Sequence, residues 1–175
     1  MMKMILMFLM CGVMGLSGVA CPDREMCRSG GVWVVEDNTS RGYAEGVLGV
    51  TLYQDAEIEP DFEVDTHGGF HGDGELLMCF SFDEAQARAL EVQLAAADQW
   101  NALPLPQPAQ AALDYIDWPI PKAQEGYWFF LDKQTGEIAQ GNQMGYECFE
   151  RYSLNWVLAV YDAQTRTLYF AELDT

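Results

Sequence analysis

Residues 75–82 read Glu-Leu-Leu-Met-Cys-Phe-Ser-Phe, and this stretch decides the fold because it alternates as a half-buried β-strand does. One face carries Leu76, Met78, Phe80 and Phe82, and the other carries Glu75, Leu77, Cys79 and Ser81. Successive side chains of a strand point to opposite faces of a sheet, so the first set is expected to face a core. The preceding segment supplies a partner, and we expect a hairpin over 57–82.

The pattern changes to that of a helix directly after this strand, over 83–100. Ser81 with Glu84 and Asp83 with Gln86 both have the spacing of a capping box. An apolar stripe recurs every three or four residues, at Ala87, Leu90, Leu94 and Ala97. The prolines of 103–108 end the helix, and a short helix is expected over 109–116.

Further strands are indicated on both sides of this unit. Runs of β-branched and aromatic residues predict strands at 31–35, 46–53, 127–131, 155–161 and 167–173. Asp132 and Asp162 each begin a turn, because an aspartate side chain accepts hydrogen bonds from backbone amides just ahead of it. The sequence therefore predicts an α+β fold: a single domain over 21–175, with an antiparallel sheet of about five to seven strands and one main helix packed on one face.

Residues 1–20 have the pattern of a signal peptide. Lys3 precedes an apolar run of about 16 residues, shorter than the ~20 that span a membrane, and Gly18-Val19-Ala20 offers small residues before a cleavage site. We expect an exported protein, located in the periplasm or cell envelope. Because Cys21 follows the small residues directly, it is the lipidation candidate, and simple secretion and a lipid anchor both remain open.

The chain is strongly acidic, with 27 Asp and Glu against 9 Lys and Arg and a net charge of −18. Removal of residues 1–20 takes away Lys3 and no acid, so the charge becomes −19. Long-range repulsion then disfavours nucleic acid and anionic lipid as partners, and a membrane is expected only through an anchor at Cys21. Solubility of an exported protein is the alternative explanation of the acidity.

Four cysteines remain after cleavage: Cys21, Cys27, Cys79 and Cys148. In an oxidising compartment we expect at least one intramolecular disulfide. If Cys21 carries lipid, the candidates are Cys27, Cys79 and Cys148, and we favour Cys27 with Cys148 because both lie in loop-like sequence.

The run 65–75, Asp-Thr-His-Gly-Gly-Phe-His-Gly-Asp-Gly-Glu, holds both histidines of the chain. Imidazoles and carboxylates bind metal ions or transfer protons, so the candidate site residues are Asp65, His67, His71, Asp73 and Glu75. The metal-ligand candidates are His67, His71 and Asp73. If the chain were extended, His67 and His71 would lie about 13 Å apart, too far for one ion, unless the glycines fold it back.

A structural explanation of this run is favoured over a chemical one. Asp-Gly between apolar strands is a common hairpin signal, and glycine adopts backbone conformations that other residues avoid. At least one alanine substitution among Gly68, Gly69, Gly72 and Gly74 is then expected to lower the melting temperature more than substitution of either histidine. No calcium-loop, nucleophile-elbow or phosphate-loop motif occurs in the chain.

The same run, with 125–132 and 161–175, resembles a family of small uncharacterised bacterial proteins. That family shares a His-Gly-Gly-Phe-x-Gly-Asp-Gly-like segment and a C-terminal Tyr-Asp-x-x-Thr-x-Thr-Leu-Tyr hairpin. The resemblance covers most of the chain after about residue 45. It implies one compact domain and no particular activity, substrate or cofactor.

The remaining candidates are aromatic. A sugar- or peptide-binding surface could use Trp100, Trp118, Tyr127, Trp128, Tyr146 and Tyr152. Strand aromatics more often belong to a core, so we expect Trp128, Phe130 and Trp156 to pack under the main helix and Trp118 to be exposed. We therefore predict an exported, acidic, non-catalytic interaction or accessory protein with no cofactor. A metal-dependent or acid/base enzyme built on the 65–75 loop is the alternative, and carbohydrate or peptide binding is the second.

Overall fold

The computed structural model describes residues 39–53, 60–68, 72–116, 120, 122–141 and 144–175. Its strands are β1 (Phe62–Asp65), β2 (Gly74–Ser81), β3 (Asn101–Ala102), β4 (Gly126–Asp132), β5 (Glu137–Ile138), β6 (Trp156–Asp162) and β7 (Thr167–Asp174). Its helices are α1 (Ser40–Leu48), α2 (Glu84–Ala96) and α3 (Gln107–Ala112), with 3-10 turns η1 (Leu113–Tyr115) and η3 (Glu147–Phe149). Within these residues the predicted α+β fold is confirmed.

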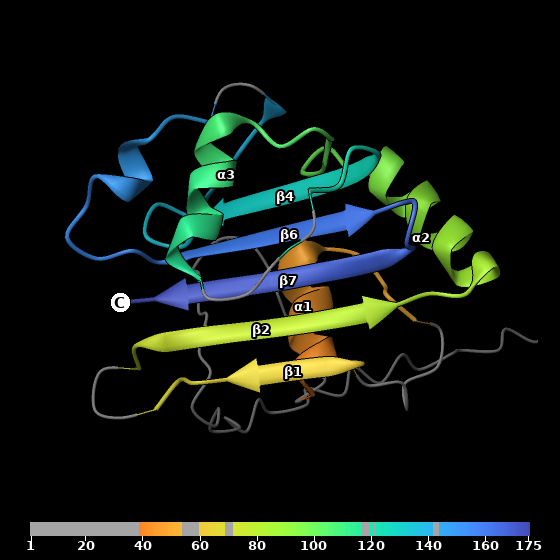
Figure 1. Cartoon of the computed structure of the whole chain (residues 1–175), viewed down its shortest axis with the longest axis horizontal. Coiled ribbons are helices and arrows are strands. Elements are labelled where there is room, and N and C mark those ends of the chain that lie inside the picture. Colours follow the sequence, from red (N-terminus) through yellow and green to blue (C-terminus); the bar gives the residue numbers. More distant parts are fainter. Residues whose placement is uncertain (1–38, 54–59, 69–71, 117–119, 121, 142–143) are drawn as a thin grey trace, which may run out of the picture. The chain divides into compact units, whose positions relative to one another are not determined.

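The strands form one antiparallel sheet in the order β1-β2-β7-β6-β4-β3, and β5 also pairs with β4 (Figure 1). The expected hairpin is present as β1 and β2. The predicted strand after the Asp162 turn is present as β7, and a short strand, β5, follows the Asp132 turn. Because β2 pairs with β7, the middle of the chain lies beside its end, with Gly74 opposite Asp174.

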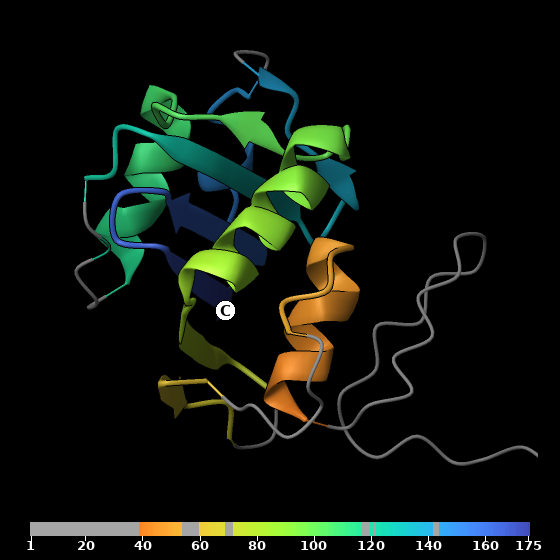
Figure 2. The same ribbon diagram turned by 90° about the vertical axis from the view of Figure 1, so that its right-hand side faces the viewer.

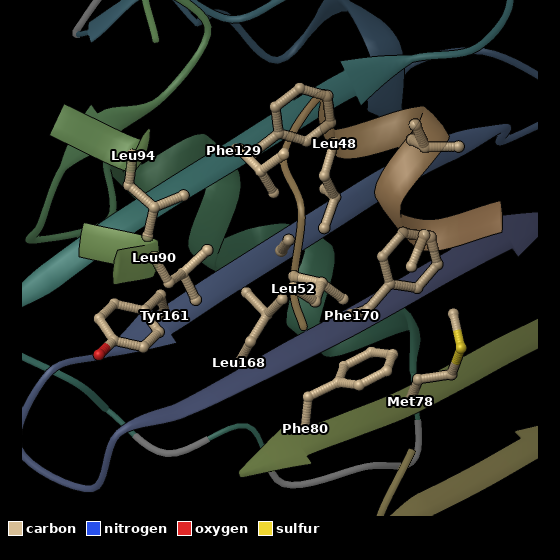
Figure 3. Close-up of a cluster of buried hydrophobic side chains, with 14 of the residues drawn as sticks. Leu48, Leu52, Met78, Phe80, Leu90, Leu94, Phe129, Tyr161, Leu168 and Phe170 are labelled. Atoms are coloured by element: carbon tan, nitrogen blue, oxygen red, sulfur yellow. The ribbon is translucent and has the colours of Figure 1, made fainter. Parts of the chain in front are cut away.

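Helices cover both faces of the sheet. α1 and α2 lie on one face and α3 on the other (Figures 1 and 2). The first face buries the alternating residues of 75–82 that the sequence assigned to a core, together with Leu48, Leu90, Leu94 and Phe170 (Figure 3). Each Leu or Phe side chain removed from water contributes roughly 1.5–3 kcal/mol, so this core is a main source of stability.

The predicted strand over 46–53 is wrong, because most of this segment belongs to or follows helix α1. The Thr39 hydroxyl accepts a hydrogen bond from the Gly42 amide at 3.0 Å and caps the start of the helix. Gly49 ends it in the left-handed conformation, with φ 65°. Ala44, Val47 and Leu48 have helical spacing and are buried against the sheet. These caps outweigh the β-propensity of the valines.

The main helix begins where the sequence places it and ends earlier. Asp83 accepts hydrogen bonds from the amides of Ala85 and Gln86, and Gln86 completes the capping box. Ser81, the other capping candidate, belongs to β2. The helix ends at Ala96, and Trp100 lies beyond it, donating a hydrogen bond through Nε1 to the Leu48 carbonyl at 3.2 Å.

The opposite face of the sheet has its own core under α3. Trp128, Phe130 and Trp156 are buried there, so the expectation that they pack under the main helix is wrong. The reason is strand phase: their neighbours Phe129 and Val157 face α1 and α2 instead. The predicted short helix over 109–116 is present as α3 and η1. Phe149 of η3 stacks on Tyr115, with ring centroids 5.7 Å apart.

Both aspartate turns form as expected. Asp132 accepts a hydrogen bond from the Gln134 amide at 3.0 Å, and Asp162 accepts one from the Gln164 amide at 2.9 Å. Both carboxylates are buried. Asp132 also pairs with Arg151, whose Nη1 lies 2.7 Å from Oδ2. These turns fix the register of the strands that lead into and out of them.

Several predictions lie outside the described residues. They are the signal peptide, the strand at 31–35, the lipidation site Cys21, and the positions of Cys27, Gly69, His71 and Trp118. Within the described ranges, no helix combines the length and the apolar character needed to cross a membrane.

Among the described residues no disulfide is found, and Cys79 and Cys148 both carry free thiols. The favoured pairing of Cys27 with Cys148 is therefore not formed in this structure. The two described cysteines also belong to separate elements, with Cys79 in β2 and Cys148 in η3.

We expect both thiols to react slowly in the folded protein. Burial raises the pKa of Cys148 to about 11, reinforced by the negative charge of Asp132, and burial with Asp61 raises that of Cys79. The thiolate is the nucleophile, so Cys148 should be alkylated about 100-fold more slowly than an ordinary cysteine at pH 7.5. Mass spectrometry after iodoacetamide treatment, in buffer and in urea, measures this difference. Equal rates in the two solvents would contradict the expectation.

Candidate functional site

Charged side chains converge at one end of the sheet. Strands β1, β7 and β4 end there, and β2 begins there. Their ends bring together five ionisable residues and one tyrosine, which we call the sheet-end cluster. Its members are Tyr43, Asp65, His67, Lys133, Glu172 and Asp174.

Local hydrogen bonds hold Asp65 and His67 at the end of β1. Oδ1 of Asp65 accepts the His67 amide at 2.9 Å and lies 2.8 Å from Nδ1 of the imidazole. Thr66 ties this turn to β2, because its amide donates to the Glu75 carbonyl and its hydroxyl accepts from the Glu75 amide, both at 2.8 Å. The imidazole is thereby oriented by backbone and carboxylate together.

Glu172 reaches the cluster through the alternation of β7. Leu168 and Phe170 face the core beneath α1, and Glu172 continues the same face at the end of the strand. Its exposed fraction is 4%. The Tyr43 hydroxyl of α1 donates a hydrogen bond to Glu172 Oε2 at 2.6 Å. A carboxylate this buried needs such partners, because transferring an unpaired charge from water into a protein is unfavourable.

Lys133 follows β4 and supplies the positive charge. Its ammonium donates hydrogen bonds to Glu172 Oε1 and, at 2.5 Å, to Asp174 Oδ2. Burial favours the neutral amine, but the carboxylates of Glu172 and Asp174 outweigh it and raise the pKa of Lys133. The lysine is therefore held as a cation and is unsuited to act as a base or nucleophile.

The imidazole of His67 also approaches Asp174. Its Nε2 lies 3.4 Å from Asp174 Oδ2, and this nitrogen is buried without a hydrogen-bond partner among the described residues. Ligand atoms of His67, Glu172 and Asp174 all lie within 4.8 Å of one another. Groups that are more than 100 residues apart in the chain thus lie close together.

The structure separates the residues that the sequence proposed as one site. Asp65 and His67 belong to the sheet-end cluster. Asp73 is exposed and Glu75 points to the opposite face of β2, the face of Leu77, so neither joins it. His71 lies outside the described residues.

Sequence reasoning missed Tyr43, Lys133, Glu172 and Asp174. One signal for Glu172 was available: it occupies the inward phase of a strand whose preceding inward residues are Leu168 and Phe170. A glutamate at a core-facing position is rare unless it is paired. Nothing in the sequence indicated that β7 pairs with β2, and this pairing is what brings Glu172 to His67.

The aromatic candidates divide between core and surface. Trp100 and Trp128 are buried and Tyr127 is half-buried. Tyr146 and Tyr152 are exposed, as is Tyr115, which the sequence did not single out. Tyr115 belongs to η1, Tyr146 directly precedes η3, and Tyr152 follows η3 by three residues.

No protein-family model, curated protein or solved structure matches this chain. The family resemblance therefore stays a prediction.

Proposed function

We propose that this chain is an exported, acidic accessory protein that acts by binding a partner and not by catalysis. The main support is that the Lys133 ammonium contacts the carboxylates of both Glu172 and Asp174 in the sheet-end cluster. Tyr43 holds the second oxygen of Glu172, and Asp65 holds Nδ1 of His67. The polar groups are used to join strand ends, which is a structural role.

Two surface properties support a binding role. The net charge of −18 favours basic or cationic partners. Tyr115, Tyr146 and Tyr152 are exposed aromatic side chains in and near η1 and η3. Aromatic side chains bury a large area at low entropic cost, and this favours peptide or carbohydrate binding as the specific form of the proposal.

Site-specific photocrosslinking tests the binding surface. A photoreactive residue at Tyr152 is expected to yield a discrete adduct in the cell envelope, identified by mass spectrometry. The matched control carries the same residue at Val92, which is 71% exposed on α2. Equal labelling at both positions would count against this surface.

Activity assays test the absence of catalysis. Ester, phosphate-ester, peptide and glycoside substrates should be turned over no faster by the parent than by a folded His67→Ala variant. A turnover that disappears in that variant would overturn the proposal and favour the acid/base alternative, in which His67 reacts with substrate.

The proposal of export predicts that the mature chain begins at Cys21. Intact mass of the protein recovered from its own cells gives the N-terminus, and partitioning into detergent reports a lipid anchor. A chain that retains Met1 would remove the export proposal, whereas an unmodified Cys21 would remove lipidation alone.

A further inference from the structure

We infer that the sheet-end cluster is a zinc site whose ligands are His67 Nε2 and the carboxylates of Glu172 and Asp174. This set differs from the 65–75 loop, because two of the three ligands come from β7. The ion would join the segment after β1 to the end of β7 and would be structural. The inference goes beyond the partner-binding role proposed above, and a structural ion in this cluster would leave that role non-catalytic.

The imidazole of His67 is oriented as a metal ligand would be. An ionised Asp65 only accepts hydrogen bonds, so the contact of 2.8 Å requires a proton on Nδ1. Nε2 is then the nitrogen that can bind an ion, and it is buried without a hydrogen-bond partner among the described residues, 3.4 Å from Asp174 Oδ2. A carboxylate on the second nitrogen is also the usual orienting partner of a zinc-bound histidine.

The carboxylates of Glu172 and Asp174 lie close together, and the Lys133 ammonium contacts both. A divalent cation would be attracted to the same pair of carboxylates.

The distances between the ligand atoms and the types of ligand fit a zinc ion. Two ligands of one tetrahedral zinc ion, with bonds of about 2.1 Å, are about 3.4 Å apart. The separation of His67 Nε2 from Asp174 Oδ2 has this value, and the whole set lies within 4.8 Å. One imidazole with two carboxylates suits zinc, whereas magnesium and calcium prefer oxygen ligands alone.

Lys133 is the competing cation in this site. Its ammonium and Nε2 of His67 converge on the same atom, Asp174 Oδ2. Zinc binding therefore requires the lysine to withdraw from that oxygen, and the side chain is 14% exposed and flexible. Removing the lysine charge should accordingly strengthen zinc binding.

The test is zinc titration of protein purified from cells that express the whole chain, with a chromophoric chelator as competitor. The parent is expected to bind one zinc ion. His67→Ala should weaken binding about 100-fold or more, and Asp65→Asn about 10- to 100-fold, because Asp65 orients the imidazole without contacting the ion. The matched control Glu75→Gln removes a charge of the same loop that faces away from the cluster and should change affinity less than about twofold.

The last variant, Lys133→Met, should bind zinc about tenfold more tightly than the parent. Circular dichroism confirms that each variant is folded, and the His67→Ala and Glu75→Gln pair decides the inference if Lys133→Met does not fold. Absence of binding by the parent at millimolar zinc would overturn it. So would binding that His67→Ala leaves intact or that Glu75→Gln weakens equally.

Discussion

Replacing Lys133 by methionine is expected to lower the free energy of unfolding by about 3 kcal/mol, or the melting temperature by roughly 10 °C. The change leaves Glu172, which is 4% exposed, with the Tyr43 hydroxyl as its hydrogen-bond donor. It also removes the ammonium from Asp174, which is partly exposed and keeps His67 nearby. Removing one member of a buried ion pair is strongly unfavourable because the remaining charge is desolvated without compensation. Urea denaturation at pH 7 measures the loss.

Two comparisons isolate the buried charge as the cause. Lys122→Met makes the same change of charge at an exposed position and should shift stability by less than about 0.5 kcal/mol. The double variant Lys133→Met, Glu172→Gln removes the uncompensated carboxylate and should recover part of the stability. If it is no more stable than Lys133→Met alone, the buried charge of Glu172 is not the reason for the loss.

The effect of pH on this pair has a definite sign. Glu172 and Asp174 raise the pKa of Lys133 in the folded protein despite the opposing effect of burial. A raised folded-state pKa contributes stability that is fully present below the unfolded-state value and is lost as pH rises through the folded-state value. The difference between the parent and Lys133→Met should therefore be constant near pH 7 and shrink above about pH 10.5.

The parts of the fold that the sequence predicted are those fixed by short-range patterns. The capping box of Asp83 and Gln86 and the alternation along β2 both depend on residues a few positions apart. Helix α1 was mistaken for a strand because Val47 and Val50 favour β-structure, while the deciding features are a threonine cap and a left-handed glycine at its two ends. Single caps are weak signals in a sequence, even though each stabilises a helix by about 1 kcal/mol.

The candidate site was only partly predictable because strand order is a long-range property. Asp65 and His67 were found from composition, and their mutual contact spans two positions. Glu172 and Lys133 join them because β2 pairs with β7, and β4 lies beyond β6 in the same sheet. No local pattern specifies which strands become neighbours. Side chains alternate between the two faces of a strand. Once β2 is paired in the sheet, Glu75 therefore lies on the face away from the cluster.

Replacing Gly74 by alanine is expected to destabilise the protein by about 2–3 kcal/mol, more than any other glycine change in its loop. A Cβ at this position would lie 2.6 Å from both the amide nitrogen and Cα of His67 and 2.8 Å from the Thr66 carbonyl carbon. These are backbone atoms, so no side-chain rotation relieves the overlap. The turn that carries His67 must move away from β2, and the hydrogen bonds of Thr66 to Glu75 must lengthen.

Alanine substitutions at neighbouring glycines are expected to lower stability by smaller amounts. Gly72 has φ +73° with open space around it, so Gly72→Ala should lower stability by about 1 kcal/mol, from the left-handed backbone alone. At Gly68 a Cβ would meet the Thr66 carbonyl oxygen at an ordinary 3.7 Å, and Gly68→Ala should be within about 0.5 kcal/mol of the parent.

His67→Ala should lose about 1 kcal/mol without added metal, as expected for one hydrogen-bonded side chain. Chemical denaturation of the four variants in zinc-free buffer gives the order. Close backbone packing over Gly74 predicts that Gly74→Ala is the less stable of these two variants. If His67→Ala is less stable instead, the loop is held chiefly by its histidine.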